Sequence, residues 1–198
     1  MQASTIRSVI YELVSSIEPF DTQEKEQIEF VKRWIASGVE IFRIEKPATP
    51  ETHLVAYAVL IDLEKNKVLL TDHKKAERWL PPGGHVDPGE HPKEAVMREI
   101  REELGIDAHF LFEEPLFLTI TPTTGKTFGH TDVSLWYVLG GYSADRFVYD
   151  ESEFNTVEWF DMQDLPYDHS DPHLERFIGK LKRATDRAPS IRNDLGTL

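Results

Sequence analysis

Apolar residues recur three and four positions apart at the start of the chain, and further on they follow the shorter rhythm of strands. Residues 2–18 carry the helical spacing, and a proline ends the run. Asp21 or Thr22 can cap a second helix, which Gly38 closes. A proline-containing connector follows. We therefore predict that residues 1–50 form a helical extension, in the shape of a hairpin.

From His53 onward, short apolar runs alternate with turns. We predict one strand from Leu54 to Leu63 and a second from Val68 to Thr71, joined by a turn that contains Asn66. The remaining predicted elements are a helix over 92–104, strands over 110–120, 131–140 and 156–160, and a final helix over 172–182. Strands and helices mix without a regular βαβ alternation, so we expect an α/β sandwich with a mixed sheet.

The predicted helix over 92–104 places three carboxylates on one face. Glu99, Glu102 and Glu103 occupy positions i, i+3 and i+4. Such a pattern is ordinarily a solvated acidic face, and like charges this close cost a helix a few tenths of a kcal/mol per pair. The opposite face, which we expect to pack against the sheet, consists of Met97, Ile100 and Leu104.

The residues around this helix favour a metal site over a solvated face. Gly83 and Gly84 allow the backbone to turn sharply and to present a carbonyl to a ligand. The sequence Asp87-Pro88-Gly89 is a turn that can return the chain to the start of the helix. Carboxylates together with a free carbonyl make an all-oxygen site, which suits Mg²⁺ or Mn²⁺.

The net charge of −13 narrows the classes of partner. It argues against a broad electrostatic contact with nucleic acid or an anionic membrane, and it repels any phosphorylated substrate unless a divalent cation intervenes. The chain has no cysteine, which excludes disulfides, zinc–thiolate sites and thiol nucleophiles. No apolar run approaches the ~18 residues of a membrane span, and the N-terminus lacks the start of a signal peptide, so we expect a cytoplasmic location.

The stretch from Gly84 to Ile106 matches the Nudix box, G-x5-E-x7-R-E-U-x-E-E-x-G-U with U aliphatic, at every defined position. The chain therefore resembles the Nudix hydrolases, over roughly residues 53–182. The resemblance implies a Nudix-type α/β/α sandwich with a mixed sheet over residues 51–184. The helical extension 1–50 would precede this domain, and a polar tail over 185–198 would follow it.

The resemblance also implies an activity, namely the Mg²⁺-dependent hydrolysis of a diphosphate linkage in a nucleoside diphosphate joined to another moiety, with Mn²⁺ as a substitute ion. The implied metal ligands are Glu99, Glu102, Glu103 and the carbonyl of Gly84. By the same resemblance, Glu90 supports the geometry between loop and helix, and Arg98 orients a box glutamate.

Nudix enzymes differ in which carboxylate takes the proton from the attacking water. The candidates here are Glu99 in the box and a remote acid on a later loop, either Glu153 or Glu151. We rank Glu153 ahead of Glu151. Two solvated loop acids are an equally good interpretation of this pair.

Several residues outside the box are candidate substrate contacts. His130 and Asp132 alternate with apolar neighbours, so both point to one face of a strand, either as a pocket pair or as a structural pair. The other candidates are His85 after the glycines and the basic cluster Lys74, Lys75 and Arg78. Aromatic side chains that could stack on a base, although strand aromatics are more often core, are Trp79, Phe128, Trp136 and Tyr137.

Three other functions are known or conceivable for chains that resemble Nudix hydrolases. An isomerase of the isopentenyl diphosphate type needs a cysteine and a degenerate box, whereas this chain has no cysteine and an intact box. An RNA decapping enzyme needs a basic channel, and the net charge of −13 argues against one. A non-catalytic nucleotide-binding or regulatory Nudix domain is the alternative function, although such domains usually lose box glutamates. We expect a small nucleotide-like substrate, no membrane and no extended nucleic acid. The helical extension suits extra packing, a homodimer surface or a lid.

Overall fold

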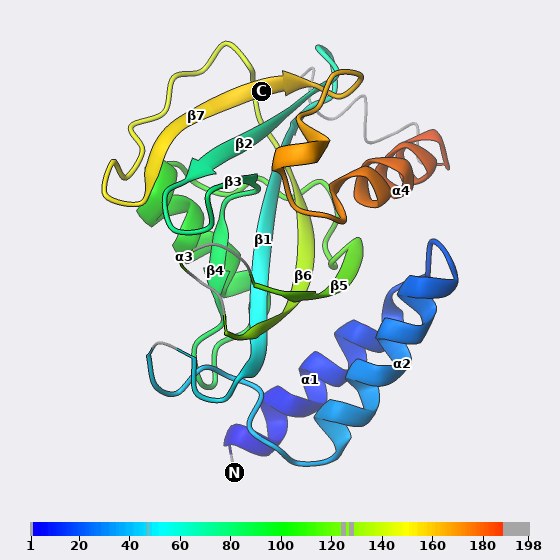
Figure 1. The fold of residues 1–198 in the computed structure, drawn as a ribbon. Coiled ribbons are helices and arrows are strands. Elements are labelled where there is room, and N and C mark those ends of the chain that lie inside the picture. Colours follow the sequence, from blue (N-terminus) through cyan, green and yellow to red (C-terminus); the bar gives the residue numbers. More distant parts are fainter. Residues whose placement is uncertain (1, 47, 124–125, 127–128, 188–198) are drawn as a thin grey trace.

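The computed structural model describes residues 2–46, 48–123, 126 and 129–187. Two helices, α1 (Gln2–Ser16) and α2 (Thr22–Ala36), form the predicted hairpin and lie side by side in Figure 1. Asp21 is the N-cap of α2, where its Oδ1 accepts a hydrogen bond from the Glu24 amide at 2.8 Å. No helix in the described ranges is long and apolar enough to cross a bilayer.

A mixed, seven-stranded sheet follows the hairpin. Its strands are β1 (Thr52–Asp62), β2 (Lys67–His73), β3 (Arg78–Leu80), β4 (Gly83–His85), β5 (Phe117–Pro122), β6 (Thr131–Gly140) and β7 (Phe154–Asp161). The order is β3-β2-β1-β6-β5, with β4 also paired to β1 and β7 to β2. The long pairing of β1 with β6 is parallel, and the other strand pairings are antiparallel.

Helices cover both faces of this sheet, which makes the α/β/α sandwich that was predicted (Figure 1). Alternate residues of β1 divide between the two faces. Leu54 and Ala56 belong to one core cluster with side chains of α1, α2 and α3 (Pro92–Leu104). Val55 and Tyr57 belong to the other, with side chains of α4 (Leu174–Arg187).

The helical extension packs against the rest of the chain through a buried charge as well as through apolar side chains. Glu24 at the start of α2 is fully buried. Its carboxylate accepts hydrogen bonds from the Lys180 ammonium of α4 at 2.7 Å and from the Leu118 amide of β5 at 3.1 Å. The extension therefore packs against the sheet and α4, which agrees with extra packing, the first of the three roles expected for it.

One predicted strand and the end of one helix differ from the structure. The strand expected over 110–120 begins only at Phe117, and Phe110 forms an isolated bridge with Leu139. Pro115 has no amide hydrogen to donate to a ladder, so the chain between these points is irregular. The final helix runs to Arg187 instead of ending near 182, which places 185–187 of the predicted tail inside α4. Residues 188–198 lie outside the described part.

The buried face of α3 is also shifted from the predicted one. Ile100 and Leu104 are buried as expected, but Met97 is 44% exposed, so its predicted packing was wrong. Val96 and Glu103 complete the buried stripe instead. A helical face is wider than the three residues chosen from the pattern, and the angle at which α3 meets the sheet selects which edge of it is covered.

Candidate active site

A cavity of about 890 Å³ opens at the face of the sheet that carries Val55 and Tyr57. Its floor also includes Thr121 and Asp132, which are paired across β5 and β6. The box residues contribute one wall through β4 and α3, and the loop before β7 contributes another. Most of the residues singled out from the sequence therefore meet at one place.

Gly84 and Glu99 are in direct contact, which explains why the box needs a glycine here. A Cβ atom on Gly84 would lie 2.4 Å from Oε1 of Glu99, far inside the van der Waals limit. The preceding Gly83 has φ +139°, and a Cβ on it would lie 2.2 Å from the Ala56 carbonyl oxygen. These two glycines let β4 pair with β1 while the box helix packs against it.

Glu103 is held inside the protein beside Glu99. Glu103 is only 4% exposed, and its Oε2 accepts a hydrogen bond from the Gly83 amide at 2.9 Å. Burial raises the pKa of Glu103 well above its usual range, and the nearby charge of Glu99 adds to the rise. Burial also raises the pKa of Glu99. Two desolvated carboxylates that repel each other form a place where a cation is stabilised.

Arg98 fixes the orientation of this acidic wall. Its Nε and Nη2 donate to the two carboxylate oxygens of Glu90 at 2.9 and 3.0 Å. Its Nη1 donates to Oε1 of Glu99 at 2.6 Å, and Nη2 also reaches the carbonyl of His85 at 3.0 Å. Glu90 in turn accepts from the Asp87 amide at 2.9 Å, which ties the loop to the helix.

The third box glutamate lies differently from the other two. The side chain of Glu102 is 63% exposed, 3.7 Å from Nη1 of Arg98, and it does not line the cavity. The structure therefore brings together Glu99, Glu103 and Gly84, with Glu102 at the solvent side of the same helix. This donor set contains only oxygen atoms and fits Mg²⁺ or Mn²⁺.

The two candidate remote acids are separated by the fold. Glu153 lines the cavity, and its charge contributes to the raised pKa values of both Glu99 and Glu103. Glu151 is exposed and outside the cavity lining. Its carbonyl accepts a hydrogen bond from the ammonium of Lys74, so Lys74, a predicted substrate contact, is turned toward this loop and is absent from the lining.

Cationic side chains are concentrated in the cavity of an otherwise acidic chain. Those that line it, besides Arg98, are Arg43, Lys46, Lys75, Arg78 and Lys126. Arg78 donates to the Ser170 carbonyl at 3.0 Å, and Lys126 lies 3.2 Å from Glu77. Sequence reasoning named Lys75 and Arg78 but missed Arg43 and Lys46. Arg43 and Lys46 belong to the connector before β1. Their local sequence pattern does not predict that this connector folds back over the site.

His130 and Asp132 do face the same side of the sheet, with Nε2 and Oδ1 separated by 3.4 Å. His85 lies in the same group, and so does His53, which sequence reasoning did not select. Burial lowers the pKa of His85 to about 2 and lowers the pKa of His130, with the charge of Arg43 acting in the same direction on both. Both lowered pKa values favour the neutral form of the His85 and His130 imidazoles.

The three aromatic candidates for base stacking that the structure describes, Trp79, Trp136 and Tyr137, do not line the cavity. Trp136 and Tyr137 are fully buried in the two cores, and Trp79 packs edge-on against Phe160. These three have the core role that is usual for strand aromatics. Phe128 lies outside the described residues.

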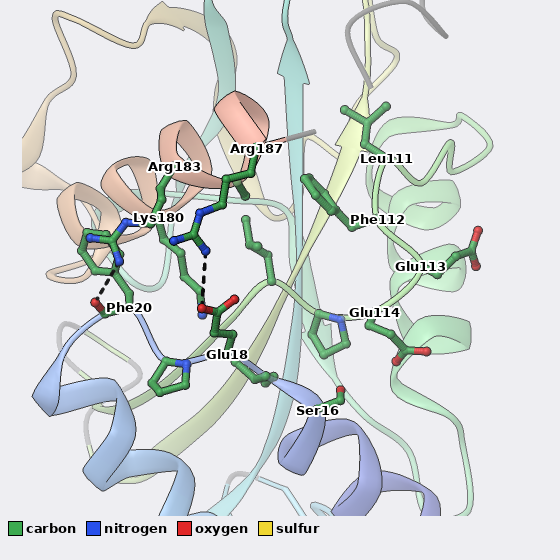
Figure 2. Close-up of a pocket in the computed structure, with 15 residues that line it drawn as sticks. Ser16, Glu18, Phe20, Leu111, Phe112, Glu113, Glu114, Lys180, Arg183 and Arg187 are labelled. Atoms are coloured by element: carbon green, nitrogen blue, oxygen red, sulfur yellow. Dashed lines mark hydrogen bonds and ion pairs between the residues drawn. The ribbon is translucent and has the colours of Figure 1, made fainter. Parts of the chain in front are cut away.

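A second cavity, of about 600 Å³, lies where the turn of the helical hairpin faces α4, and Figure 2 shows its lining. Arg183 and Arg187 project into it from α4, and Arg187 lies 3.4 Å from Glu18. None of the box residues reaches this cavity. The candidate active site is therefore the larger one.

Comparison with known proteins identifies the family of this chain. The sequence model of the NUDIX domain family matches residues 52–180 of this chain. An 8-oxo-dGTP diphosphatase of Escherichia coli is 32% identical over 132 residues, which cover 63% of this chain and 92% of that protein. An m7GpppN-mRNA hydrolase of Xenopus laevis is 46% identical over 57 residues, covering 26% of this chain but only 19% of that longer protein.

The likeness extends to solved structures. A NUDIX-family hydrolase from Clostridium perfringens has a TM-score of 0.51 at 23% identity, covering 67% of this chain and 97% of that one, which shows a shared fold. The domain model covers well over half of the residues, from the first strand of the sheet into α4. This chain therefore belongs to the Nudix hydrolase family.

Proposed function

We propose that this protein hydrolyses a diphosphate linkage in a small nucleotide-like substrate, with Mg²⁺ or Mn²⁺ as cofactor. One observation carries the proposal: Glu99, Glu103 and the backbone of Gly84 share a cavity with five cationic side chains besides Arg98. The relatives named as a diphosphatase of an oxidised nucleotide and as a hydrolase of an RNA cap both act on phosphoanhydrides of nucleotides, which supports this class of substrate.

The size of the cavity favours a small substrate. Its volume of about 890 Å³ falls within the range of roughly 300–1,000 Å³ typical of small-molecule sites. The cationic residues offset locally a net charge of −13 that would otherwise repel phosphate. Arg43 and Lys46 enter from the connector before β1, so the connector closes one side of the binding site.

The residues that would hold the metal are Glu99, Glu103, the carbonyl of Gly84 and, from the solvent side, Glu102. When bound, Mg²⁺ neutralises the phosphate oxygens and makes the phosphorus a better target for water. Arg98 keeps Glu99 oriented, and the Gly83 amide keeps Glu103 oriented. The substrate therefore meets a carboxylate wall whose geometry is set before binding.

Glu153 is the better placed of the candidate general bases. One oxygen of Glu99 already accepts a strong, charge-assisted hydrogen bond from Arg98. Glu153 lies on the loop before β7, close enough to Glu99 and Glu103 to influence their pKa values, and it faces the cavity. In this assignment Glu153 accepts the proton of the water that attacks phosphorus.

The test is a hydrolysis screen with and without Mg²⁺ over oxidised nucleoside triphosphates, ADP-ribose, dinucleoside polyphosphates and sugar nucleotides. We expect Glu103→Gln to lower kcat about 100-fold, because loss of metal-assisted charge stabilisation costs several kcal/mol. Glu113→Gln, at an exposed acid outside this cavity, should leave kcat unchanged.

Full activity of Glu103→Gln would refute the ligand assignment. A wild-type protein that binds one of these nucleotides in calorimetry but cleaves none of them, with Mg²⁺ or with Mn²⁺, would instead establish the non-catalytic binding domain as its function.

A further inference from the structure

We propose that His53, His85, His130 and Asp132 form a second metal site, separate from the box carboxylates, and that this site binds a Zn²⁺ ion. Among the described residues, these four form a group of side chains that could together hold a metal ion. One ligand atom of each lies within 4.8 Å of the other three. The proposal concerns a different ion and different donors from those of the proposed hydrolysis.

The sheet itself assembles this cluster. β4, β1 and β6 are adjacent strands, and His53 is paired with Asp132 across β1 and β6. His85 is paired with Val55, two residues along β1 from His53 and on the same face of the sheet. His130 comes immediately before β6 and turns back to Asp132. Backbone hydrogen bonds between three strands therefore fix the positions of the donors.

The distances inside the cluster suit a tetrahedral ion. Oδ1 of Asp132 lies 3.5 Å from Nε2 of His53 and 3.4 Å from Nε2 of His130. Zinc bonds to nitrogen and oxygen are about 2.0–2.1 Å long, so neighbouring ligands of a tetrahedral zinc are roughly 3.3–3.4 Å apart. These two separations are close to those of a loaded site, and the remaining ligand atoms lie within 4.8 Å of one another.

The buried atoms of the cluster lack other partners. Nε2 of His53, Nε2 of His85 and Oδ1 of Asp132 are all inaccessible to solvent and make no hydrogen bond in the described structure. His53 is fully buried, and its Nδ1 lies 2.7 Å from the carbonyl of Pro50. A carbonyl only accepts, so Nδ1 carries the proton and the lone pair of Nε2 points into the cluster. A carbonyl that orients a histidine in this way is typical of metal ligands.

A metal-free ion pair explains these contacts less well. A charge-assisted hydrogen bond from imidazole to carboxylate measures about 2.7–2.9 Å, which is shorter than either separation found here. The ring centroid of His53 lies 4.7 Å from that of His85 and 5.0 Å from that of His130. Protonation of several of these rings would therefore bring like charges together. A dication resolves both the missing hydrogen bonds and the crowding.

The donor types select zinc over magnesium. Three imidazoles and one carboxylate are a borderline-soft set, which suits Zn²⁺ in tetrahedral geometry, whereas Mg²⁺ prefers six oxygen atoms. Four protein ligands leave no open position, so the ion would be structural. Because β4 carries both His85 and Gly84, zinc here would hold the strand that supports the box against β1 and β6.

The experiment measures zinc binding directly, in protein freed of any affinity tag and of bound metal. Zn²⁺ is titrated in the presence of excess Mg²⁺, which occupies the box carboxylates, and retained metal is counted by mass spectrometry. We expect one Zn²⁺ per chain and a rise in melting temperature that Mg²⁺ alone does not produce. Co²⁺ in place of Zn²⁺ should give the strong visible absorption of a tetrahedral ion.

Variants locate the site and separate it from the proposed active centre. His130→Gln and Asp132→Asn should each weaken zinc binding at least about 100-fold, whereas Glu103→Gln and the exposed His109→Gln should keep it. The proposal is overturned if wild-type protein retains no zinc or gives an octahedral cobalt spectrum, or if only Glu103→Gln loses the ion. Failure of hydrolysis alone would not affect this result, since no step of the test uses a nucleotide.

Discussion

Glycine at position 84 is required by a side chain that is distant in sequence, and this makes a sharp test. Gly84→Ala would place a methyl group on the carboxylate of Glu99 and push that carboxylate away from its present position. We expect kcat to fall by about 100-fold or more, because the metal wall loses its geometry, while the melting temperature changes little.

The control is Gly38→Ala at the end of the hairpin. Nothing lies within 4 Å of that position, but its φ of +80° should cost about 1 kcal/mol of stability. A loss of activity in this control, or unchanged turnover in Gly84→Ala, would contradict the explanation.

Substitutions at Glu153 and Glu151, which lie on one loop, distinguish a general base from a neighbouring acid without a catalytic role. Glu153→Gln should lower kcat by about 10²–10⁴-fold with little change in KM, as expected for loss of a general base. Glu151→Gln should be near neutral, since that side chain is exposed outside the cavity. Steady-state kinetics at saturating Mg²⁺ distinguish the two, and near-neutral effects of both substitutions would leave Glu99 as the better candidate.

Asp171 is a buried acid on the cavity wall, and it makes stability depend on pH. Burial raises the pKa of Asp171 to about 6, above the value of 3.8 for an unperturbed aspartate. The folded state therefore holds the proton more tightly, and this favourable contribution is lost as pH rises from about 4 to above 6.

Asp171→Asn should accordingly be more stable than wild type at high pH, and its advantage should grow by about 2 kcal/mol between about pH 4.5 and about pH 8. Urea unfolding at the two pH values measures this difference. In Asp168→Asn, at an exposed position nearby, the stability relative to wild type should not change with pH. An advantage of Asp171→Asn that is the same at both pH values would disprove the assignment.

At the scale of the elements, the periodic pattern of α3 predicts which residues share a face, whereas packing decides which of them are buried. The spacing of Glu99 and Glu103 predicted that both lie on one side of the helix. It did not reveal that Glu103 would be buried with the apolar residues while Met97 would be exposed. That outcome depends on β4, whose Gly83 amide provides Glu103 with a buried partner.

Glu24 of α2, Leu118 of β5 and Lys180 of α4 form a buried polar seam between the helical extension and the rest of the chain. Among the contacts between elements, this seam has the clearest energetic consequence. Lys180→Met would leave Glu24 buried with its hydrogen bonds to amides but without its cation. Breaking a buried pair in this way typically costs about 3–5 kcal/mol. Chemical denaturation should show a loss of this order, whereas Lys182→Met on the exposed side of α4 should change stability by less than about 0.5 kcal/mol. Equal stability of the two variants would show that this seam does not hold the extension.

At the scale of the whole molecule, the acidic chain gathers cationic side chains at the cavity from segments far apart in the sequence. If these side chains attract the substrate, Lys46→Gln should raise KM several-fold and weaken the dependence of KM on salt. Lys32→Gln, at a surface pair on α2, is the matched control and should leave KM unchanged. Identical KM values for wild type and Lys46→Gln across a range of salt concentrations would remove Lys46 from the binding site.

Sequence alone determined the helical hairpin, the mixed sheet, the box helix and the class of chemistry, because each depends on a local pattern of apolar, acidic and glycine residues. Tertiary structure decided which acids share a cavity: Glu103 and Glu153 face it, while Glu102 and Glu151 are at the surface. It also brought His53 to Asp132 and folded Arg43 over the site. Those placements depend on strand register and on how the connector packs, and both are set by contacts between residues far apart in the chain.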